Sequence, residues 1–231
     1  MKKIEYSIKT VSNCLIGNQT ESFSIGGVDQ ATTMDENGNP MIHGSAIKGA
    51  LRNMVREQDN QMKKTKELMK IILEDIKQKY DELEEHVKER DAIQKVIKKV
   101  EEICQLPVKA EYIFGIEGIN NAPRLFFSDL RIMKESKNQD YFLIDTKNAL
   151  EEKEGEILSR PRTYKVLKPG IKLKGYIVFQ DFEQYSELLG DLFRELKEVL
   201  LLFNEGMYGL GNSKSRGYGR IEVLEKNIIS K

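Results

Sequence analysis

The chain has 231 residues, enough for one or two domains with a sizeable hydrophobic core. Its 37 lysines and arginines balance its 37 aspartates and glutamates, so overall charge does not indicate a polyanion as partner, although a local basic cluster is compatible with this balance. Cys14 and Cys104 form no CxxC pair, and we expect no zinc site. No signal-type or membrane-spanning apolar run is visible, so we expect a cytoplasmic protein without membrane contact.

The N-terminal part of the chain predicts a strand, a turn-rich segment and a helix. Ile4, Tyr6 and Ile8 alternate with polar residues, as in a half-buried strand. Residues 17–43 are rich in Gly, Asn, Thr and Asp, which favours turns. A helix should then begin near Ser45, whose side chain suits an N-cap. Four apolar positions form its predicted buried stripe: Ile47, Leu51, Met54 and Val55.

Residues 57–105 contain no glycine and no proline. Apolar residues recur there at three- or four-residue spacing, from Leu68 to Val87 and from Ile93 to Ile103, which predicts a long amphipathic helical region. Asp91 followed by Gln94 resembles a capping box that starts a second helix, so a helical hairpin is favoured over a single rod. Such a hairpin either serves packing alone or is a docking arm for a partner subunit.

Strand patterns return after Pro107. Residues 124–132 predict one strand, and the polar residues 134–161 predict a loop or a thumb-like excursion. Residues 164–167 and 173–179 flank a Lys-Pro-Gly turn and predict either a hairpin or two strands of a sheet.

A long apolar stripe follows Asp181 and predicts a helix that ends near Gly206. The order is therefore strand, helix, strands, helix, strand. This order predicts an α+β fold of the ferredoxin-like (RRM-like) type, with the helices on one face of an antiparallel sheet. Four phenylalanines in apolar patterns are expected in its core: Phe126, Phe127, Phe193 and Phe203.

Residues 209–219 read Gly-Leu-Gly-Asn-Ser-Lys-Ser-Arg-Gly-Tyr-Gly and are followed by a strand-like run. The glycines permit sharp turns and close approach to a ligand, Lys214 and Arg216 could meet a phosphate, and Tyr218 could stack on a base or pack on the core. A clamp for a nucleic-acid backbone is one interpretation, and a simple turn between helix and strand is the other. The Walker and dinucleotide motifs are excluded, because no Gly-Lys-Ser/Thr ending and no following helix are present.

Further motifs occur in a characteristic order. A Gly-Gly-Val-Asp turn at 26–29 precedes His-Gly-Ser-Ala-Ile-Lys-Gly-Ala-Leu-Arg at 43–52. Ile-Phe-Gly at 113–115 precedes Pro-Arg-Leu-Phe-Phe-Ser-Asp at 123–129, and Val-Leu-Lys-Pro-Gly follows at 166–170. With the glycine-rich loop, these segments resemble the RAMP superfamily proteins of type III CRISPR effector complexes, most of all the repeated backbone subunit. The resemblance covers most of the chain but not its helical segment.

The resemblance implies a core of residues 1–56 and 106–231, a thumb-like excursion at about 134–170 and an insertion at 57–105. It implies that the subunit coats CRISPR RNA, binds complementary target RNA and assembles with other effector subunits, including copies of itself. In this family a loop aspartate cuts the target RNA, and Asp29 falls at its place. A divalent cation, Mg²⁺ or Mn²⁺, is expected for cleavage and would bind Asp29.

Other interpretations of these acids and histidines stay open. Asp29 could be an ordinary turn aspartate, and Asp35 is the nearby competitor, better explained as a turn residue before Asn-Gly. His43 could be a general base in metal-free cleavage or a structural residue. His86, among acids and a lysine, is expected on the solvated surface.

The residues expected to contact RNA lie in the predicted first helix and in the glycine-rich loop. Lys48 and Arg52 share a helix face, and with Ser45 and the amides at the helix start they would form an anion site. Arg160, Arg162 and Lys165 could touch the duplex near the thumb. The full set expected to bind RNA is Ser45, Lys48, Arg52, Gly209, Gly211, Asn212, Ser213, Lys214, Ser215 and Arg216.

Four functions are compatible with the sequence. The first is an effector backbone subunit that cuts target RNA at Asp29. The second is a non-catalytic guide-binding or capping subunit of the same fold. The third is a metal-independent CRISPR RNA-processing endonuclease, against which the presence of only two histidines argues. The fourth is a structural protein whose helical arm drives assembly without RNA.

Overall fold

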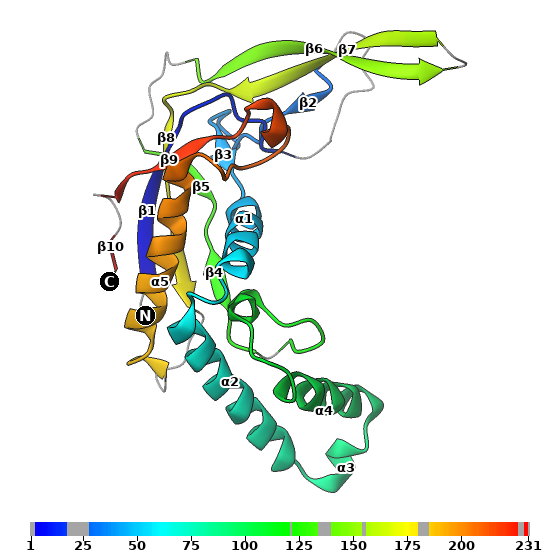
Figure 1. The fold of residues 1–231 in the computed structure, drawn as a ribbon, viewed down its shortest axis with the longest axis vertical. Coiled ribbons are helices and arrows are strands. Elements are labelled where there is room, and N and C mark those ends of the chain that lie inside the picture. The colour runs from blue at the N-terminus through cyan, green and yellow to red at the C-terminus, as the bar shows by residue number, and fades with distance from the viewer. Residues whose placement is uncertain are drawn as a thin grey trace.

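A computed structural model describes residues 3–17, 28–120, 122–133, 140–153, 156–179, 185–225 and 229–230. The protein has a mixed α+β fold, elongated in outline, with a ribbon at one end and a helical arm at the other (Figure 1). Among the described residues, no helix combines the length and the apolar character that crossing a membrane requires.

A seven-stranded sheet forms the centre of the molecule. The strand predicted at the N-terminus is β1 (Lys3–Thr10), which pairs antiparallel with β8 (Lys172–Phe179). The other edge of β1 pairs with β9 (Ile221–Val223) and β10 (Ile229–Ser230). The other edge of β8 pairs with β4 (Leu125–Phe127) and β5 (Leu130–Ile132), and β5 pairs with β3 (Met41–Ile42).

Two helices cover one face of this sheet, α1 (Gly44–Glu57) and α5 (Leu189–Leu201) (Figure 1). Their apolar stripes bury against alternate strand residues, as amphipathic helices on a half-buried sheet should. The stripe predicted for α1 is confirmed, since all four of its residues are buried. α5 continues into η3 (Leu202–Glu205) and ends at Gly206, where φ is 79°, as the sequence predicts. Asp181, expected to cap this helix, lies outside the described residues.

The single strand predicted at 124–132 is interrupted by a β-bulge. Residues 128–130 stand opposite residues 175–176 of β8, so β4 and β5 carry one extra residue between them. Ser128 fills the irregular position: its amide donates to the Tyr176 carbonyl (3.0 Å), and its Oγ accepts from the Tyr176 amide (2.8 Å).

A second sheet of three strands forms the ribbon. β6 (Phe142–Lys153) and β7 (Glu156–Leu167) pair antiparallel along their whole length, and β2 (Gln30–Ala31) pairs parallel with β7. The ribbon projects away from the central sheet (Figure 1). Strand pairing thus replaces the loop considered for 134–161. The predicted segments 164–167 and 173–179 belong to different sheets and do not form a hairpin.

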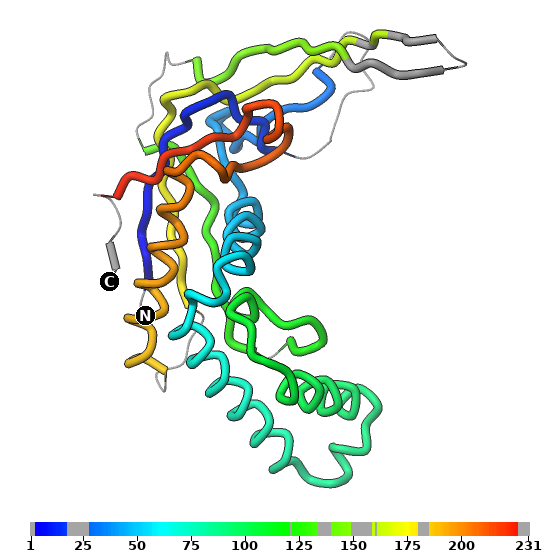
Figure 2. Tube along the Cα trace, viewed as in Figure 1, coloured from blue at the N-terminus to red at the C-terminus, as the bar shows by residue number. Residues whose placement is uncertain are grey.

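The arm consists of α2 (Lys63–Asp81), α3 (Glu85–Lys88) and α4 (Asp91–Cys104), and α2 and α4 pack against each other (Figure 2). The helical region predicted from residue 57 is broken first at 58–62, between α1 and α2. The predicted capping box is wrong: Arg90 occupies the N-cap of α4 without a side-chain cap bond, and Asp91 already lies in the first turn.

Side chains from distant segments anchor the arm to the core. Glu195 of α5 accepts hydrogen bonds from the amides of Lys64 and Thr65 at the start of α2, both at 2.8 Å, and from Thr65 Oγ1 at 2.7 Å. The Tyr185 hydroxyl donates to Asp75 at 2.5 Å. The two amide bonds to Glu195 satisfy donors that a helix start leaves without internal partners.

Candidate nucleic-acid interface

A row of cations lies along α1 beside its buried stripe. Lys48, Arg52 and Arg56 follow one another at four-residue spacing, so they share one side of the helix. Arg56 was not predicted as a site residue, although the same spacing that links Lys48 to Arg52 extends to it.

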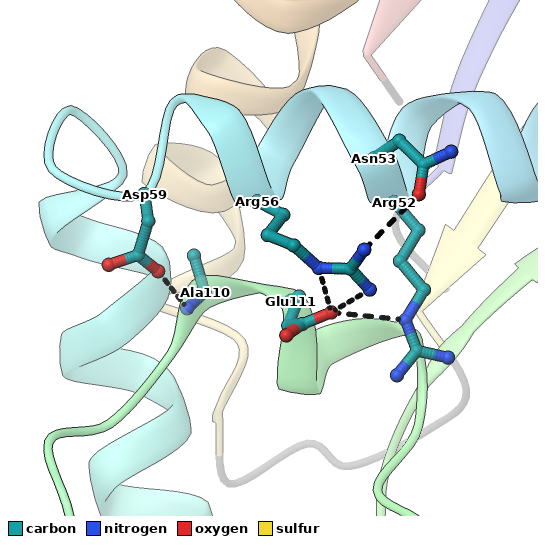
Figure 3. Close-up of polar contacts among 6 residues, drawn as sticks. All are labelled: Arg52, Asn53, Arg56, Asp59, Ala110 and Glu111. Carbon is teal, nitrogen blue, oxygen red and sulfur yellow. Dashed lines mark hydrogen bonds and ion pairs between the residues drawn. The ribbon is translucent and has the colours of Figure 1, made fainter.

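One carboxylate orients two of these arginines. Glu111, in the short helix η1 (Ala110–Phe114), accepts from Arg56 Nη2 at 2.7 Å and Nε at 3.0 Å, and from Arg52 Nε at 3.4 Å (Figure 3). The hydrogen bond from Arg56 is the main cause that lowers the pKa of Glu111. Figure 3 shows the terminal nitrogens of Arg52 pointing away from Glu111. Arg52 is therefore fixed through Nε, while its terminal nitrogens are directed elsewhere.

The start of α1 is capped from the sheet, not by Ser45. The Gly44 amide donates to Asp129 Oδ1 at 2.8 Å, and Asp129 comes from the bulge between β4 and β5. Ser45 is the second residue of the helix, with an exposed side chain, so its prediction as N-cap is wrong. The aspartate supplies the acceptor that the helix start requires, from a distance of 85 residues in sequence.

A hollow of about 320 Å³ opens beside this helix start. Ser45, Lys48 and Arg124 line it, and Arg124 is a further cation that was not predicted as a site residue. Burial is the main cause that lowers the pKa of Lys48, followed by the positive charges of Arg124 and Arg52. Lys48 and Arg124 repel each other across the hollow, so an anion bound between them would relieve that repulsion.

The glycine-rich loop has a defined shape that depends on glycine. Gly211 and Gly219 have φ angles of 78° and 75°, and a Cβ there would overlap the Leu15 and Leu210 carbonyl oxygens, respectively. Hydrogen bonds close the loop: Leu210 N to Gly219 O at 2.9 Å, and Asn212 N to Leu15 O at 2.9 Å. The predicted strand that follows is β9.

The cations of this loop point into solvent. Lys214, Ser215 and Arg216 form the short helix η4 (Lys214–Arg216), and all three are exposed. Ser213 before them adopts a left-handed conformation, φ 59°. Tyr218 packs in a small cluster with Leu15, Tyr164 and Val166, which settles its role in favour of packing over base stacking.

Tyr218 also ties the loop to the ribbon. Its hydroxyl donates to Asp145 of β6, and Lys147 Nζ lies 4.0 Å from the centre of its ring. Burial, followed by the bond to Asp145, raises the pKa of Tyr218.

Asp29 is exposed and lies where β2 begins beside β7. Its amide donates to the Thr163 carbonyl at 2.8 Å, and its Oδ2 accepts from the Thr163 amide at 2.5 Å. The preceding double glycine, residues 26–27, lies outside the described residues. Within the described part of the chain, no group of three or more His, Cys, Asp or Glu side chains could hold a metal ion.

The other candidate residues have mainly structural contacts. Asp35 accepts from the amides of Asn37 (3.0 Å) and Asn39 (2.9 Å), which confirms it as a turn residue. His43 Nδ1 lies 3.6 Å from Asp129 Oδ1 at the start of α1. His86 lies 3.1 Å from Glu84 and is 67% exposed, as expected for solvated surface.

The ribbon and the phenylalanines complete the predicted set. Lys165 Nζ lies 4.8 Å from the centre of the Phe142 ring, and Arg162 is exposed, whereas the side chain of Arg160 lies outside the described residues.

Phe127, Phe193 and Phe203 are buried as predicted. Phe126 is 46% exposed, so its assignment to the core is wrong. It lies on the uncovered face of β4, opposite the face that α1 packs on.

The fold and this basic surface belong to a known class of protein. A family model of the RAMP superfamily matches residues 7–222, and the chain is a member of that superfamily. It is 26% identical to the "CRISPR system Cms endoribonuclease Csm3" of Methanocaldococcus jannaschii over 99% of this chain and 80% of that protein. In fold it resembles a chain in the cryo-EM structure of the Type III-B Cmr-beta bound to cognate target RNA, with a TM-score of 0.55 and 17% identity. The alignment covers 99% of this chain and 60% of that one.

Proposed function

We propose that this chain is a backbone subunit of a type III CRISPR effector complex, that it binds CRISPR RNA and that it cleaves complementary target RNA at Asp29. The observation that carries the proposal is the cationic face beside α1, where Lys48, Arg52, Arg56 and Arg124 gather and Glu111 pairs with two of the arginines. Such a concentration of positive charge suits a phosphate backbone. The similarity to Csm3 over nearly the whole chain supports the same assignment.

The architecture suggests a role for each part. The central sheet with α1 and α5 has the strand and helix order of a ferredoxin-like unit, and we assign it as the RNA-holding core. The β6–β7 ribbon is then the thumb, which would separate segments of the guide–target duplex. The arm of α2–α4 is an insertion that contacts neighbouring subunits, which include further copies of this chain.

Asp29 is suited to act on a phosphate for a simple reason. The Thr163 amide holds one carboxylate oxygen, which fixes the orientation of the group at the base of the ribbon. A carboxylate fixed in this way can orient the ribose 2′-hydroxyl, whose oxygen attacks the neighbouring phosphorus to form a 2′,3′-cyclic phosphate. The bond from phosphorus to the 5′-oxygen of the next nucleotide breaks, and that oxygen takes up the proton that the 2′-hydroxyl releases. Asp29 can also contribute one ligand to Mg²⁺ or Mn²⁺, ions that are commonly held by one or two carboxylates together with substrate phosphates. When bound, such an ion would stabilise negative charge on the phosphate.

The second candidate function is a guide-binding subunit of the same fold that does not cut. The contacts of Asp29 favour it, because a carboxylate that accepts the Thr163 amide can serve only to hold β2 beside β7. The histidine-dependent processing endonuclease has less support, since the chain has only two histidines and one of them, His86, is 67% exposed on the arm.

Cleavage by the assembled complex separates these two functions. We expect Asp29→Ala to bind target RNA as tightly as the wild type and to leave it uncut, with activity in Mg²⁺ and none in EDTA for the wild type. The matched control is Asp35→Ala, six residues away in a turn, which should cut normally. Equal cleavage by the wild type and Asp29→Ala, or binding without cleavage by both, would assign the chain to the guide-binding class.

RNA binding itself is tested on the full chain. Replacing Lys48 and Arg124 together with alanine should weaken binding to RNA of any sequence and reduce the slope of log affinity against log salt by about two. The control pair is Lys95→Ala with Lys98→Ala, two exposed lysines on α4. If both pairs weaken binding equally, the surface beside α1 is not the RNA site.

A further inference from the structure

The face of the central sheet opposite α1 and α5 carries an exposed aromatic pair. Phe126 of β4 and Tyr176 of β8 are 46% and 39% exposed, and their ring centres lie 6.3 Å apart at an angle of 39°. Lys3 Nζ lies 5.6 Å from the centre of the Tyr176 ring. Exposed rings cost hydrophobic free energy, so two adjacent rings on an open sheet indicate a surface that a ligand covers.

Cations stand opposite one another on the same face. Lys174 pairs in register with Arg131 of β5, and Lys172 pairs in register with Lys9 of β1. Like charges directly opposite on neighbouring strands destabilise a sheet. Within the described part of the chain, neither Lys172 nor Lys174 takes part in an ion pair with an acid. These pairs are unfavourable for the isolated fold and favourable for a fold that binds a polyanion.

The acids on this face are mostly engaged elsewhere. Glu5 lies 2.6 Å from Lys3, and Asp129 accepts the amide that starts α1. Asp35 accepts two backbone amides and lies 3.9 Å from Arg131. Glu222 stands opposite Lys9 at the far edge of β1. Each of these acids therefore has a partner of its own, and Lys174 at the centre of the face is left without an acid partner among the described residues.

The aromatic pair borders the basic site at the helix start. A hollow of about 670 Å³ lies over the sheet, and its lining includes the rings of Phe126 and Tyr176, the cations Arg131 and Lys174, and the acids Glu5 and Asp129. Phe126 also lines the smaller hollow that holds Ser45, Lys48 and Arg124. One ligand can thus pass from the cations beside α1, over Phe126, onto the sheet.

We propose that this sheet face binds unpaired RNA, with bases stacked on Phe126 and Tyr176 and phosphates held by Lys174 and Arg131. Stacking on aromatic side chains requires bases that are splayed from a helix, so the ligand is single-stranded and not a guide–target duplex. The combination of rings and cations favours nucleic acid over an apolar protein partner. The inference rests on the proposed function, because it assigns a second part of the surface to the same RNA.

A tryptophan reporter tests the stacking directly. The chain contains no tryptophan, so Tyr176→Trp places a single one on the sheet, and Leu106→Trp places one at an exposed position after α4. Each variant is titrated with a short oligouridylate. We expect the fluorescence of Trp at 176 to be quenched as RNA binds and that at 106 to stay constant. Constant fluorescence at both positions, while the RNA binds, would overturn the proposal.

Affinity measurements give an independent test. Phe126→Ala with Tyr176→Ala should weaken oligouridylate binding by at least about 5- to 150-fold, the range for loss of one stacked base, without changing the salt slope. Lys174→Ala should reduce that slope by about one. The aromatic exchange Phe126→Tyr with Tyr176→Phe should retain wild-type affinity. Because these side chains are exposed, unchanged melting temperatures are expected and verify folding.

The possible failures can be told apart. If Lys48→Ala with Arg124→Ala abolishes binding and the aromatic double variant binds as wild type, the sheet proposal is wrong and the proposed function stands. If the wild-type chain binds no RNA, both are wrong. If the aromatic variants change the sedimentation of the chain and leave RNA affinity unchanged, the face is a protein interface, and the sheet proposal is again overturned.

Discussion

Lys48 shows how a single side chain reports the electrostatics of this surface. It lies between Arg52, one turn along the helix, and Arg124, and its pKa is lowered by burial and by both charges. The guanidinium groups do not titrate in the accessible pH range, so the local positive charge is fixed except at Lys48. Lys48 is therefore the group through which pH can weaken the site.

RNA affinity should fall as the pH rises, because Lys48 loses its charge before an ordinary lysine does. A phosphate binds the protonated amine, and the lowered pKa means that Lys48 loses its proton as the pH approaches the ordinary lysine value of about 10.4 from below. We expect wild-type affinity for 2′-O-methyl RNA, which survives alkaline pH, to decline over this range. Lys48→Arg should decline less, because arginine stays charged. Parallel pH profiles for the two proteins would show that Lys48 does not contact the phosphate.

Tyr6 is a residue whose polar atom lacks a partner. It is 1% exposed, and its hydroxyl finds no hydrogen-bond partner among the described residues. Tyr6→Phe should therefore raise the free energy of unfolding, by roughly 1–3 kcal/mol. Urea unfolding measures this, with the exposed Tyr176→Phe as a neutral control. A loss of stability in Tyr6→Phe would mean that the hydroxyl is satisfied in solution.

The same residue gives a pH dependence of stability. Burial raises the pKa of Tyr6, so the unfolded chain releases the phenolic proton at a lower pH than the folded one. Wild-type stability should thus fall as the pH rises above about 10, the ordinary tyrosine value, and Tyr6→Phe should lack this part of the fall.

At the scale of elements, helix starts depend on side chains from distant segments. Asp129 caps α1, Glu195 caps α2, and Asp59 accepts the Ala110 amide at 2.7 Å at the start of η1 (Figure 3). Each cap joins two elements, so each both satisfies a helix end and fixes the position of its neighbour.

The Glu195 cap is the connection between arm and core that is easiest to test. Glu195→Ala removes the acceptor for two amides and for the fully buried Thr65 hydroxyl, and should cost roughly 1–3 kcal/mol. Urea unfolding and hydrogen exchange should show the loss first in α2. Glu198→Ala, at an exposed position of the same helix, is the matched control. Equal stability of the two variants would refute the role given to this cap.

These distant caps explain where prediction from sequence succeeds and fails. Periodicity is a local signal, and it predicted the strand at Ile4–Ile8 and the stripe of α1; the glycine that ends a helix is another, and it predicted the end of the last helix at Gly206. Local cap signals at Ser45 and Asp91 failed because the true acceptor at α1 is 85 residues away and α4 has no side-chain cap bond.

In the candidate site, too, residues with a local sequence signal were predicted, and residues placed by contacts between distant segments were missed. The loop cations and the Lys48–Arg52 spacing are visible in the sequence. Arg124 is not, because only the packing of β4 against α1 brings it to Lys48. The exposure of Phe126 was missed because an apolar run such as Leu-Phe-Phe does not reveal which residue faces solvent.

At the scale of the whole molecule, the two sheets meet at the glycine-rich loop. Cys14 pairs with Leu167 in an isolated bridge, and Leu15, Tyr164, Val166 and Tyr218 form a small core of their own. The hydroxyl bond from Tyr218 to Asp145 crosses this junction. The cations at Lys214–Arg216 are thus positioned relative to the ribbon as well as to the core.

Removing that bond should loosen the junction. Tyr218→Phe keeps the ring and its packing but leaves half-buried Asp145 without the donor, so we expect faster hydrogen exchange in β6 near Asp145 and weaker RNA binding by a few-fold. Tyr164→Phe in the same cluster provides a comparison. Unchanged exchange in β6 would show that packing alone holds the loop against the ribbon.

The bulge at residues 128–130 changes which positions of this segment face the open side of the sheet. Before it, the even-numbered Phe126 points to the open face; after it, the odd-numbered Arg131 does so, while Leu125, Phe127, Leu130 and Ile132 all face the helices. Deletion of one residue here would therefore remove the bulge and leave one regular strand, in which the same side chains face the helices on both sides of the deletion. If Asp129 is the residue deleted, the inside and outside of the sheet are preserved, and what is lost is the acceptor at the start of α1.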